Sequence, residues 1–301
     1  MQSLIKAAVL AKREERYEDA ERIYRDWMAA YPADPRPRYG LALLLLARGS
    51  YNEGWRLYEA RADIPETRIH KPRLSFPEWN GAEVQSLLLW PEQGLGDQIM
   101  YARFVPKLLA RGYSVTMLAP PPLVRVLRPL GCNIISAEGE VGIPRHEAWC
   151  LVGSLPHLVG EIPTAPYLTG SEKGTGVGVM AAGNPQHVND AARSLPPNLR
   201  GELLRMGRDL SPASTGAADF EETAEIIRGL ETVISVDTAV AHLAGAMGKP
   251  TWLLLPYQAE WRWGRGHSVT NLYPSMRLFR QETPGDWRQP LRDVREALLA
   301  R

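Results

Sequence analysis

The sequence predicts an all-α helical repeat followed by two α/β halves, each with a parallel sheet. Three observations indicate this fold class. Small and aromatic residues recur at a fixed spacing near the N-terminus, short apolar runs alternate with helix-period segments beyond it, and this alternation occurs twice along the chain. The chain of 301 residues is also too long for one ordinary mixed domain.

The N-terminal repeat covers residues 1–63 and has the period of tetratricopeptide units, because each repeated position returns 34 residues further on. The first set of positions is Tyr17, Ala20, Ile23 and Tyr24, and it returns as Tyr51, Gly54, Leu57 and Tyr58. An ordinary amphipathic helical hairpin with a coincidental match is the alternative. Two units are fewer than the three or so that a free-standing array needs, so we expect this segment to pack on the domains that follow.

Residues 64–81 form a predicted linker, and residues 82–173 form the first α/β half. The linker contains Pro65, Pro72 and Pro77 without a sustained period, which predicts a segment lying over a surface. In the first half, short apolar runs predict strands and longer periodic stretches predict helices. The strands are expected near residues 84–90, 114–118 and 133–135, and the helices at 97–110 and 123–130.

The second half, residues 174–301, restarts the alternation after a loop-rich stretch at 156–174. Strands are expected at 177–181, 233–236 and 251–255, helices at 197–206, 220–229 and 239–247, and a further helix near the C-terminus. The region between Ser194 and Thr232 is short and leaves little room for a full strand beyond Arg208 to Ser211. Two such halves leave a cleft at the carboxyl ends of their strands, where open α/β folds usually bind ligands.

Composition argues against several function classes. Lys and Arg total 35 against 34 for Asp and Glu, so a formal charge of +1 supplies no field that would hold nucleic acid or an anionic membrane. Two cysteines, Cys132 and Cys150, are too few for a disulfide scaffold or a thiolate metal site. No apolar run approaches the roughly 20 residues of a transmembrane helix, and no signal-peptide pattern is present. We therefore expect a cytoplasmic protein without a transmembrane segment.

The first candidate site is the glycine turn between the first strand and the first helix of the first half. Gly94 and Gly96 permit a tight turn with close backbone approach, and Asp97 stands where the helix begins. Asp97 is interpreted either as a helix cap or as a general base that faces the cleft. A dinucleotide-binding turn is disfavoured, because the third glycine of that fingerprint is absent.

The second candidate site runs from Ser235 to Gly245, from the end of a strand into a helix. The first turn of such a helix offers free N–H groups and a positive dipole end to a phosphate. Asp237 and Thr238 are also good helix caps, which is the alternative. His242 is more readily interpreted as a packed side chain than as a catalyst, and no second histidine or cysteine lies at metal-ligand spacing.

Two further loops follow strands of the second half. Residues 183–194 are polar and end with Arg193 and Ser194, which suits phosphate recognition, and a solvated surface loop is the alternative. Residues 261–267 combine tryptophan with arginine, and Trp261 offers a stacking face for a base or a sugar ring. The aromatic side chains could equally anchor this loop onto the core.

Four stretches, in this order along the chain, resemble those of a known enzyme family. They are EQGLGDQIMYARFVP, GNPQHVNDAARSLP, VISVDTAVAHLAGAMGKP, and WRW followed by YPSMRLFRQ and GDW. They resemble the tetratricopeptide-containing branch of the family-nine glycosyltransferases, relatives of the ADP-heptose lipopolysaccharide heptosyltransferases. The resemblance runs from the repeat nearly to the C-terminus. It implies a GT-B fold of two Rossmann-like domains, with the sugar nucleotide held mainly by the second.

The resemblance also implies roles for individual residues. Asp97 matches the position of the candidate base that deprotonates the acceptor hydroxyl, and Arg193 matches a basic residue near the diphosphate. The motif from Asp237 to Ala239 matches the loop that meets the donor phosphates and sugar, while His242 belongs to that motif without an assigned role. Relatives usually have tryptophan where this chain has Ala181. The expected donor-binding residues are Gly94, Gly96, Gln98, Gly183, Asn184, Asn189, Arg193, Ser194, Asp237, Thr238, Ala239, His242 and Trp261.

These expectations lead to one principal hypothesis and one alternative. The first is an inverting, metal-independent glycosyltransferase, similar to heptosyltransferases, that moves a sugar from a nucleotide-sugar donor to a glycan or protein hydroxyl. Helix-end amides and an arginine stabilise the departing diphosphate, so no metal is expected. The nucleotide-sugar is a substrate, and no cofactor is expected. The alternative is a catalytically inactive tetratricopeptide adaptor with a GT-B-like domain, whose repeats bind a protein partner.

Overall fold

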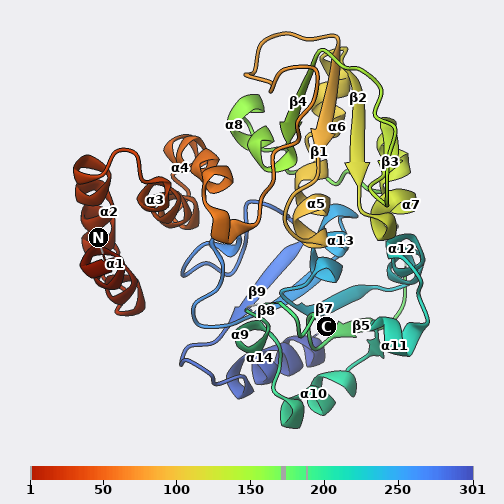
Figure 1. Cartoon of the computed structure of the whole chain (residues 1–301). Coiled ribbons are helices and arrows are strands. Elements are labelled where there is room, and N and C mark those ends of the chain that lie inside the picture. Colours follow the sequence, from red (N-terminus) through yellow and green to blue (C-terminus); the bar gives the residue numbers. More distant parts are fainter. Residues whose placement is uncertain (1, 171–173, 188, 301) are drawn as a thin grey trace.

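The computed structural model describes residues 2–170, 174–187 and 189–300. A helical N-terminal unit precedes two α/β halves, and each half is built on one parallel sheet (Figure 1). The predicted α/β fold class with parallel sheets is thus confirmed. The ends of the predicted domains at residues 1, 173 and 301 lie outside the described residues.

The N-terminal unit is built from consecutive helices that pack as neighbours along the chain. They are α1 (Gln2–Arg13), α2 (Tyr17–Ala30), α3 (Pro35–Ala47) and α4 (Tyr51–Tyr58), followed by a 3₁₀ helix at Glu59–Asp63. The small positions of the repeat, Ala20 and Gly54, are buried where helices meet. A Cβ at Gly54 would lie 2.8 Å from Leu46 Cδ2, so close packing explains this glycine. The assignment of these helices to tetratricopeptide units remains a prediction.

The segment that follows the helical unit lies along the first sheet at its edge strand. Ile69 and Phe76 pack with Trp149 in a small apolar cluster. The Trp79 N–H donates to the Trp149 carbonyl (2.6 Å), and the Trp149 N–H donates to the Pro77 carbonyl (3.0 Å). The segment therefore continues the backbone hydrogen bonding of that strand.

The first sheet is parallel and has the strand order β3-β2-β1-β4. Its strands are β1 (Ser86–Trp90), β2 (Ser114–Ala119), β3 (Asn133–Ser136) and β4 (Ala148–Leu151). Strand β4 is not among the expected strands. It is a run of 4 residues, all buried, and a run this short without alternation carries little sequence signal.

The helices of the first half are shorter than expected. They are α5 (Leu95–Ala102), α6 (Val105–Ala110), α7 (Val124–Leu127) and α8 (Leu155–Val159). The single helix expected at 97–110 is interrupted because Pro106 has no N–H to donate to the carbonyl of Ala102. The stretch at 123–130 contains one α-helical turn between two proline-containing 3₁₀ helices. Helix α8 overlaps the stretch that was expected to be loop.

The second sheet is parallel and has the strand order β6-β5-β7-β8-β9. Its strands are β5 (Val177–Met180), β6 (Arg208–Asp209), β7 (Thr232–Val236), β8 (Thr251–Leu255) and β9 (Met276–Arg280). Strand β6 has 2 residues and lies within the stretch 208–211, beyond which little room for a strand was expected. Strand β9 is not among the expected strands, because its two arginines interrupt a short apolar run at the sheet edge.

The second half contains the expected helices and, in addition, two helices of one turn each, α9 and α11, that were not expected. The helices are α9 (Asp190–Arg193), α10 (Pro197–Leu204), α11 (Pro212–Thr215), α12 (Phe220–Arg228), α13 (Ala239–Ala246) and α14 (Arg288–Leu299). None of the helices among the described residues combines the length and the apolar composition that crossing a membrane requires.

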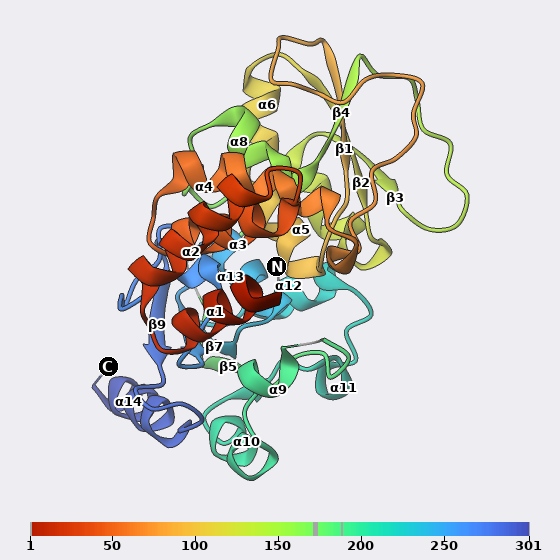
Figure 2. The same cartoon turned by 60° about the vertical axis from the view of Figure 1, so that its left-hand side comes forward.

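The three parts of the chain meet around helices α5 and α13, which face each other between the sheets (Figure 1). A Cβ at Gly96 would lie 2.8 Å from His242 Cδ2, so the absence of a side chain permits this approach. Trp55 of the helical unit lies edge-on to Tyr101 of the first half and to Trp261 of the second, with ring centroids 6.5 and 5.1 Å away. Figure 2 shows the helical unit in front of this junction.

Candidate active site

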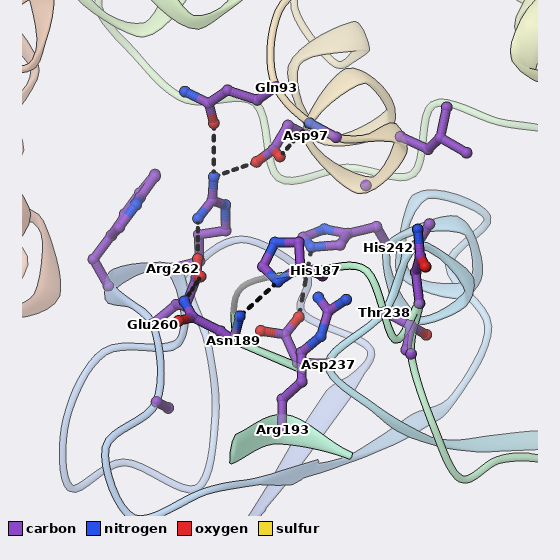
Figure 3. A pocket seen from close by; sticks show the side chains of 18 of the residues that line it. Gln93, Asp97, His187, Asn189, Arg193, Asp237, Thr238, His242, Glu260 and Arg262 are labelled. Carbon is purple, nitrogen blue, oxygen red and sulfur yellow. Dashed lines mark hydrogen bonds and ion pairs between the residues drawn. The ribbon is translucent and has the colours of Figure 1, made fainter. Parts of the chain in front are cut away.

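A cleft of about 1650 Å³ opens where the three parts meet. The loops that line it follow the carboxyl ends of β1, β5, β7 and β8, and residues of α1 to α3 close one side. Figure 3 shows side chains from the two halves pointing towards one another across this space. Loops distant in sequence are thus brought together, as parallel strands in open α/β folds predict.

Asp97 lies in the first turn of α5, and its two carboxylate oxygens have different partners. Oδ2 accepts a hydrogen bond from the Gly94 N–H (3.0 Å), so Gly94 holds the cap position and Asp97 the third helical position. Oδ1 forms an ion pair with Arg262 of the opposite half. The interpretation of Asp97 as the N-cap residue is therefore wrong, because Gly94 holds that position. The carboxylate reaches back to the turn with one oxygen and faces the cleft with the other.

Arg262, in the loop after β8, joins the two halves at this carboxylate. Its guanidinium also donates to Glu260 Oε2 (2.5 Å) and Gln93 Oε1 (3.2 Å), and its Cζ lies 4.5 Å from the ring centroid of Trp261. Burial lowers the pKa of Arg262, but Asp97 and Glu260 outweigh burial and hold that pKa well above its usual value. The guanidinium is therefore charged. Sequence reasoning selected only Trp261 from this loop, although an arginine between two tryptophans was an available signal.

The start of α13 presents a second group of polar atoms to the cleft. Thr238 holds the cap position in an extended conformation, but its side chain makes no capping hydrogen bond. Its hydroxyl lies instead within hydrogen-bond distance of the Ser235 hydroxyl (3.1 Å). This side chain therefore does not cap the N–H groups of the first turn, such as that of Ala239. These groups stand at the positive end of the helix dipole.

Asp237 lies beside this helix start and is 8% exposed. Burial, followed by the nearby charge of Glu260, raises the pKa of the Asp237 carboxyl from 3.8 to about 6. A raised pKa means that the folded protein favours the neutral carboxyl. This carboxyl therefore contributes stability that is complete below about pH 3.8 and is lost as the pH rises through about 6.

Replacing Asp237 by Asn is expected to raise the free energy of unfolding at neutral pH by about 1 to 3 kcal/mol, because a neutral amide removes the cost of the buried charge. The difference between the two proteins should be largest above pH 6 and should shrink between about pH 6 and pH 4. Denaturant unfolding at a series of pH values measures this difference. An equal difference at every pH would contradict a raised pKa for Asp237.

His242 is buried where α5 meets α13, at the edge of the cleft. Burial, and then the charge of Arg262, lower the pKa of His242 well below its usual value, so the ring is neutral. Its Nδ1 lies 3.0 Å from the Tyr273 hydroxyl, and its Nε2 lies 3.9 Å from Asp237 Oδ1. These contacts favour the packed interpretation of His242. No set of three or more His, Cys, Asp and Glu side chains among the described residues is arranged to hold a metal ion.

The loop after β5 supplies Gly183, Asn184, Asn189 and Arg193 to the cleft. The Arg193 Nε lies 3.6 Å from Asp190 Oδ1, beyond ordinary hydrogen-bond distance. This buried Nε has no hydrogen-bond partner among the described residues. The Arg193 guanidinium therefore has capacity left for an anion.

Two expected donor-binding residues, Gln98 and Ser194, do not line the cleft. Gln98 is buried, and its side-chain amide donates to the Glu92 carbonyl. Ser194 donates to Asp190 Oδ1 (2.7 Å) and accepts from the Gly183 N–H (2.8 Å). These hydrogen bonds commit both side chains to the shape of the loops. The prediction that Gln98 and Ser194 contact the donor directly is therefore wrong. Both side chains hold the loops in shape behind the wall of the cleft.

Trp261 packs against the helical unit. Its ring centroid lies 5.1 Å from that of Trp55 and 5.8 Å from that of Tyr58. These contacts favour the anchoring interpretation of Trp261, which also lines the cleft. The remaining expected residues that line the cleft are Gly94, Gly96, Asp97, Asp237, Thr238 and Ala239.

Comparison with known proteins finds a similarity to one enzyme family in the second half of the chain. Residues 173–266 match the profile of Glycosyltransferase family 9 (heptosyltransferase). The matched segment runs from the region of β5 to the loop after β8 and contains Arg193, Asp237 and Arg262. This segment of the second half is therefore similar to glycosyltransferases of that family.

Individual relatives are distant in sequence. Protein FlbA of Caulobacter vibrioides is 24% identical over an alignment of 335 positions, which covers 87% of the chain and 54% of FlbA. The chain thus spans about half the length of this curated relative. The iron-containing dodecameric glycosyltransferase TibC from enterotoxigenic E. coli H10407 has a TM-score of 0.46 and 14% identity over 72% of the chain and 67% of TibC. E. coli ADP-heptose lipopolysaccharide heptosyltransferase II has a TM-score of 0.44 and 13% identity over 71% of the chain and 99% of that enzyme.

Proposed function

We propose that the chain is an inverting glycosyltransferase with a GT-B arrangement, which moves a sugar from a nucleotide-sugar donor to a hydroxyl of a glycan or protein. One observation carries this proposal. The Asp97 carboxylate of the first half lines the same cleft as Arg193 and the start of α13 in the second half (Figure 3). Glycosyl transfer requires a base at the acceptor hydroxyl and positive charge at the departing diphosphate.

The second half is the proposed donor site. The first-turn N–H groups of α13 suit the diphosphate, and the Arg193 guanidinium can bind its oxygens in a fork. Asn184 and Asn189, in the loop that carries Arg193, offer amide groups to sugar hydroxyls. This positive charge stabilises the departing diphosphate, so the proposed reaction uses neither a metal nor a cofactor.

Asp97 is the proposed general base. The acceptor hydroxyl gives its proton to the Asp97 carboxylate, and its oxygen attacks the anomeric carbon from the face opposite the diphosphate. The bond from that carbon to the diphosphate oxygen breaks, and its electron pair leaves with the nucleoside diphosphate. A single displacement of this kind inverts the configuration of the anomeric carbon.

An inactive adaptor is not favoured, because the cleft contains both the carboxylate and the cations that the reaction requires. A role for the helical unit in binding a protein partner, as tetratricopeptide repeats do, remains part of the proposal. Its residues on α1 to α3 line the cleft, so an acceptor bound at Asp97 would lie beside this unit.

A thermal-shift screen against nucleotide-sugars tests the proposed function. An ADP-linked heptose leads the panel, because the matched profile is described as heptosyltransferase. A ligand at 100 times its Kd stabilises the folded protein by about 2.7 kcal/mol, which gives a measurable rise in Tm. The donor that binds is then tested for Asp97-dependent transfer. If no nucleotide-sugar stabilises the protein, the proposed function is wrong.

Arg193→Gln is expected to weaken the binding of a nucleoside diphosphate by about 1.5 to 3 kcal/mol, the range for a hydrogen bond to a charged group. Calorimetry with the nucleotide found in the screen measures this loss. Arg205→Gln is the matched control, because Arg205 is an exposed arginine just after α10 and does not line the cleft. Equal affinity of the two variants would remove Arg193 from the donor site.

A further inference from the structure

Arg262 already has two negatively charged partners, and a further anion that enters the cleft would compete with them for its guanidinium. It contacts two carboxylates, Asp97 from the opposite half and Glu260 from its own loop, as well as the side-chain oxygen of Gln93. These contacts use its two terminal nitrogens. Its Nε is buried and has no hydrogen-bond partner among the residues that the structure describes. The two terminal nitrogens of the guanidinium therefore have hydrogen-bond partners, and its Nε has a donor left over.

Arg262 also lies within electrostatic reach of the proposed donor site. The charges of Arg262 and Arg193 both act on Asp237 and on His242, beside and within the first turns of α13. In Figure 3, Arg262 stands below Asp97 and Gln93, and Arg193 and Asp237 project into the same space from the opposite side. A diphosphate on α13 would therefore meet two guanidinium groups, of which only Arg262 is paired with Asp97.

The loop that carries Arg262 is anchored on both sides of this residue. Trp261 packs edge-on against Trp55 of the helical unit, 5.1 Å between ring centroids. Trp263 is 1% exposed, and its ring centroid lies 5.1 Å from that of His242. A change of partner at Arg262 therefore requires only its own side chain to turn, while the backbone of the loop stays in place.

We propose that Asp97 and the donor diphosphate compete for Arg262. This inference rests on the proposed function. A diphosphate carries more negative charge than a carboxylate and offers several oxygens to the guanidinium fork, so it draws Arg262 away from Asp97. Oδ1 of Asp97 is then free to accept the proton of the acceptor hydroxyl. The base therefore becomes available only once the donor is bound.

A double-mutant cycle with ADP and UDP as probes tests this competition. Asp97→Asn removes the charge that holds Arg262, so it is expected to tighten binding of the preferred nucleoside diphosphate about 3- to 10-fold. In the Arg262→Gln background, the same Asp97→Asn change is expected to alter the Kd less than about twofold. Calorimetry at one pH and one salt concentration gives the four Kd values of the cycle.

Arg265→Gln is the matched control for Arg262→Gln. Arg265 lies in the same loop, but its guanidinium lies over the Tyr17 ring, with Cζ 3.5 Å from the ring centroid. The gain from Asp97→Asn should persist in this background. An equal or larger gain in the Arg262→Gln background would indicate simple repulsion between Asp97 and the phosphates, and it would overturn the proposal. An unchanged Kd for Asp97→Asn would do the same.

A crystal structure of the wild-type chain with the bound nucleoside diphosphate provides a second test that does not depend on variants. Arg262 is expected to contact a phosphate oxygen and to have left Asp97. An Arg262 that still pairs with Asp97 overturns the competition. Failure of the wild-type chain to bind any nucleoside diphosphate removes the proposed function together with this inference, whereas binding without coupling removes only the inference.

Discussion

Asp97→Asn is expected to lower the turnover of sugar transfer by about 10²- to 10⁴-fold, the range for the loss of a general base. The amide cannot take the proton of the acceptor hydroxyl. Its oxygen can still accept the hydrogen bond from the Gly94 N–H, so the turn before α5 is retained. Nucleoside diphosphate binding should tighten rather than weaken, because Arg193 and α13 are unchanged and the charge of Asp97 no longer holds Arg262. Steady-state transfer to an identified acceptor, together with calorimetry, measures both quantities.

Glu222→Gln provides the matched control for the structural part of this change. Glu222 lies in the first turn of α12 and reaches back to accept from the Ala218 N–H (2.8 Å), as Asp97 does from Gly94, but it does not line the cleft. Loss of its charge should affect stability slightly and turnover very little. If Asp97→Asn transfers sugar as fast as this control, the carboxylate serves the helix start alone and is not the base.

Arg61→Met is expected to lower the free energy of unfolding by about 3 to 5 kcal/mol, because it leaves a buried carboxylate without its cation. The Arg61 side chain is fully buried and donates to both oxygens of Glu92, at 3.0 and 2.7 Å, and to the Ser154 hydroxyl at 3.0 Å. Burial lowers the pKa of Arg61, but Glu92 more than offsets burial and keeps that pKa high. Denaturant unfolding measures the loss of stability.

The double variant Arg61→Met/Glu92→Gln should recover part of this loss, because no buried charge then remains unpaired. Arg56→Met is the control, since Arg56 is an exposed arginine on α4. Stability equal to that of the control would show that the helical unit does not depend on this pair. Arg61 follows α4 and Glu92 stands two residues before Gly94, so the pair ties the helical unit to the turn that carries Asp97.

Much of the fold could be predicted because its signals are local. The short apolar run before Gly94 predicts β1. The apolar run that ends at Val236 predicts a strand followed by the start of α13. Both signals lie within a few neighbouring residues of the sequence. Strands β4 and β9, both at sheet edges, could not be predicted, because β4 has only 4 residues and two arginines interrupt the apolar pattern of β9. Their pairing partners, rather than their own composition, make them strands.

The sequence predicts which loops form the candidate site, but it does not predict which side chains pair with one another there. Asp97, Arg193 and Asp237 all line the cleft, as residues at the carboxyl ends of parallel strands are expected to do. Gln98 and Ser194 were assigned to the same cleft from their neighbours in sequence. Their hydrogen bonds to backbone and to Asp190 turn them away from it, and no local pattern shows that direction.

By itself, the sequence determined the order of the three parts, the parallel α/β character of two of them, and the polar loops at the strand ends, because periodicity and turn residues act over short distances. Only the tertiary structure decided that Arg262 pairs with Asp97, 165 residues earlier in the chain, and that Arg61 pairs with Glu92. Such pairs depend on how the two sheets and the helical unit pack together. Burial then strengthens these charge interactions, because little water remains to screen them.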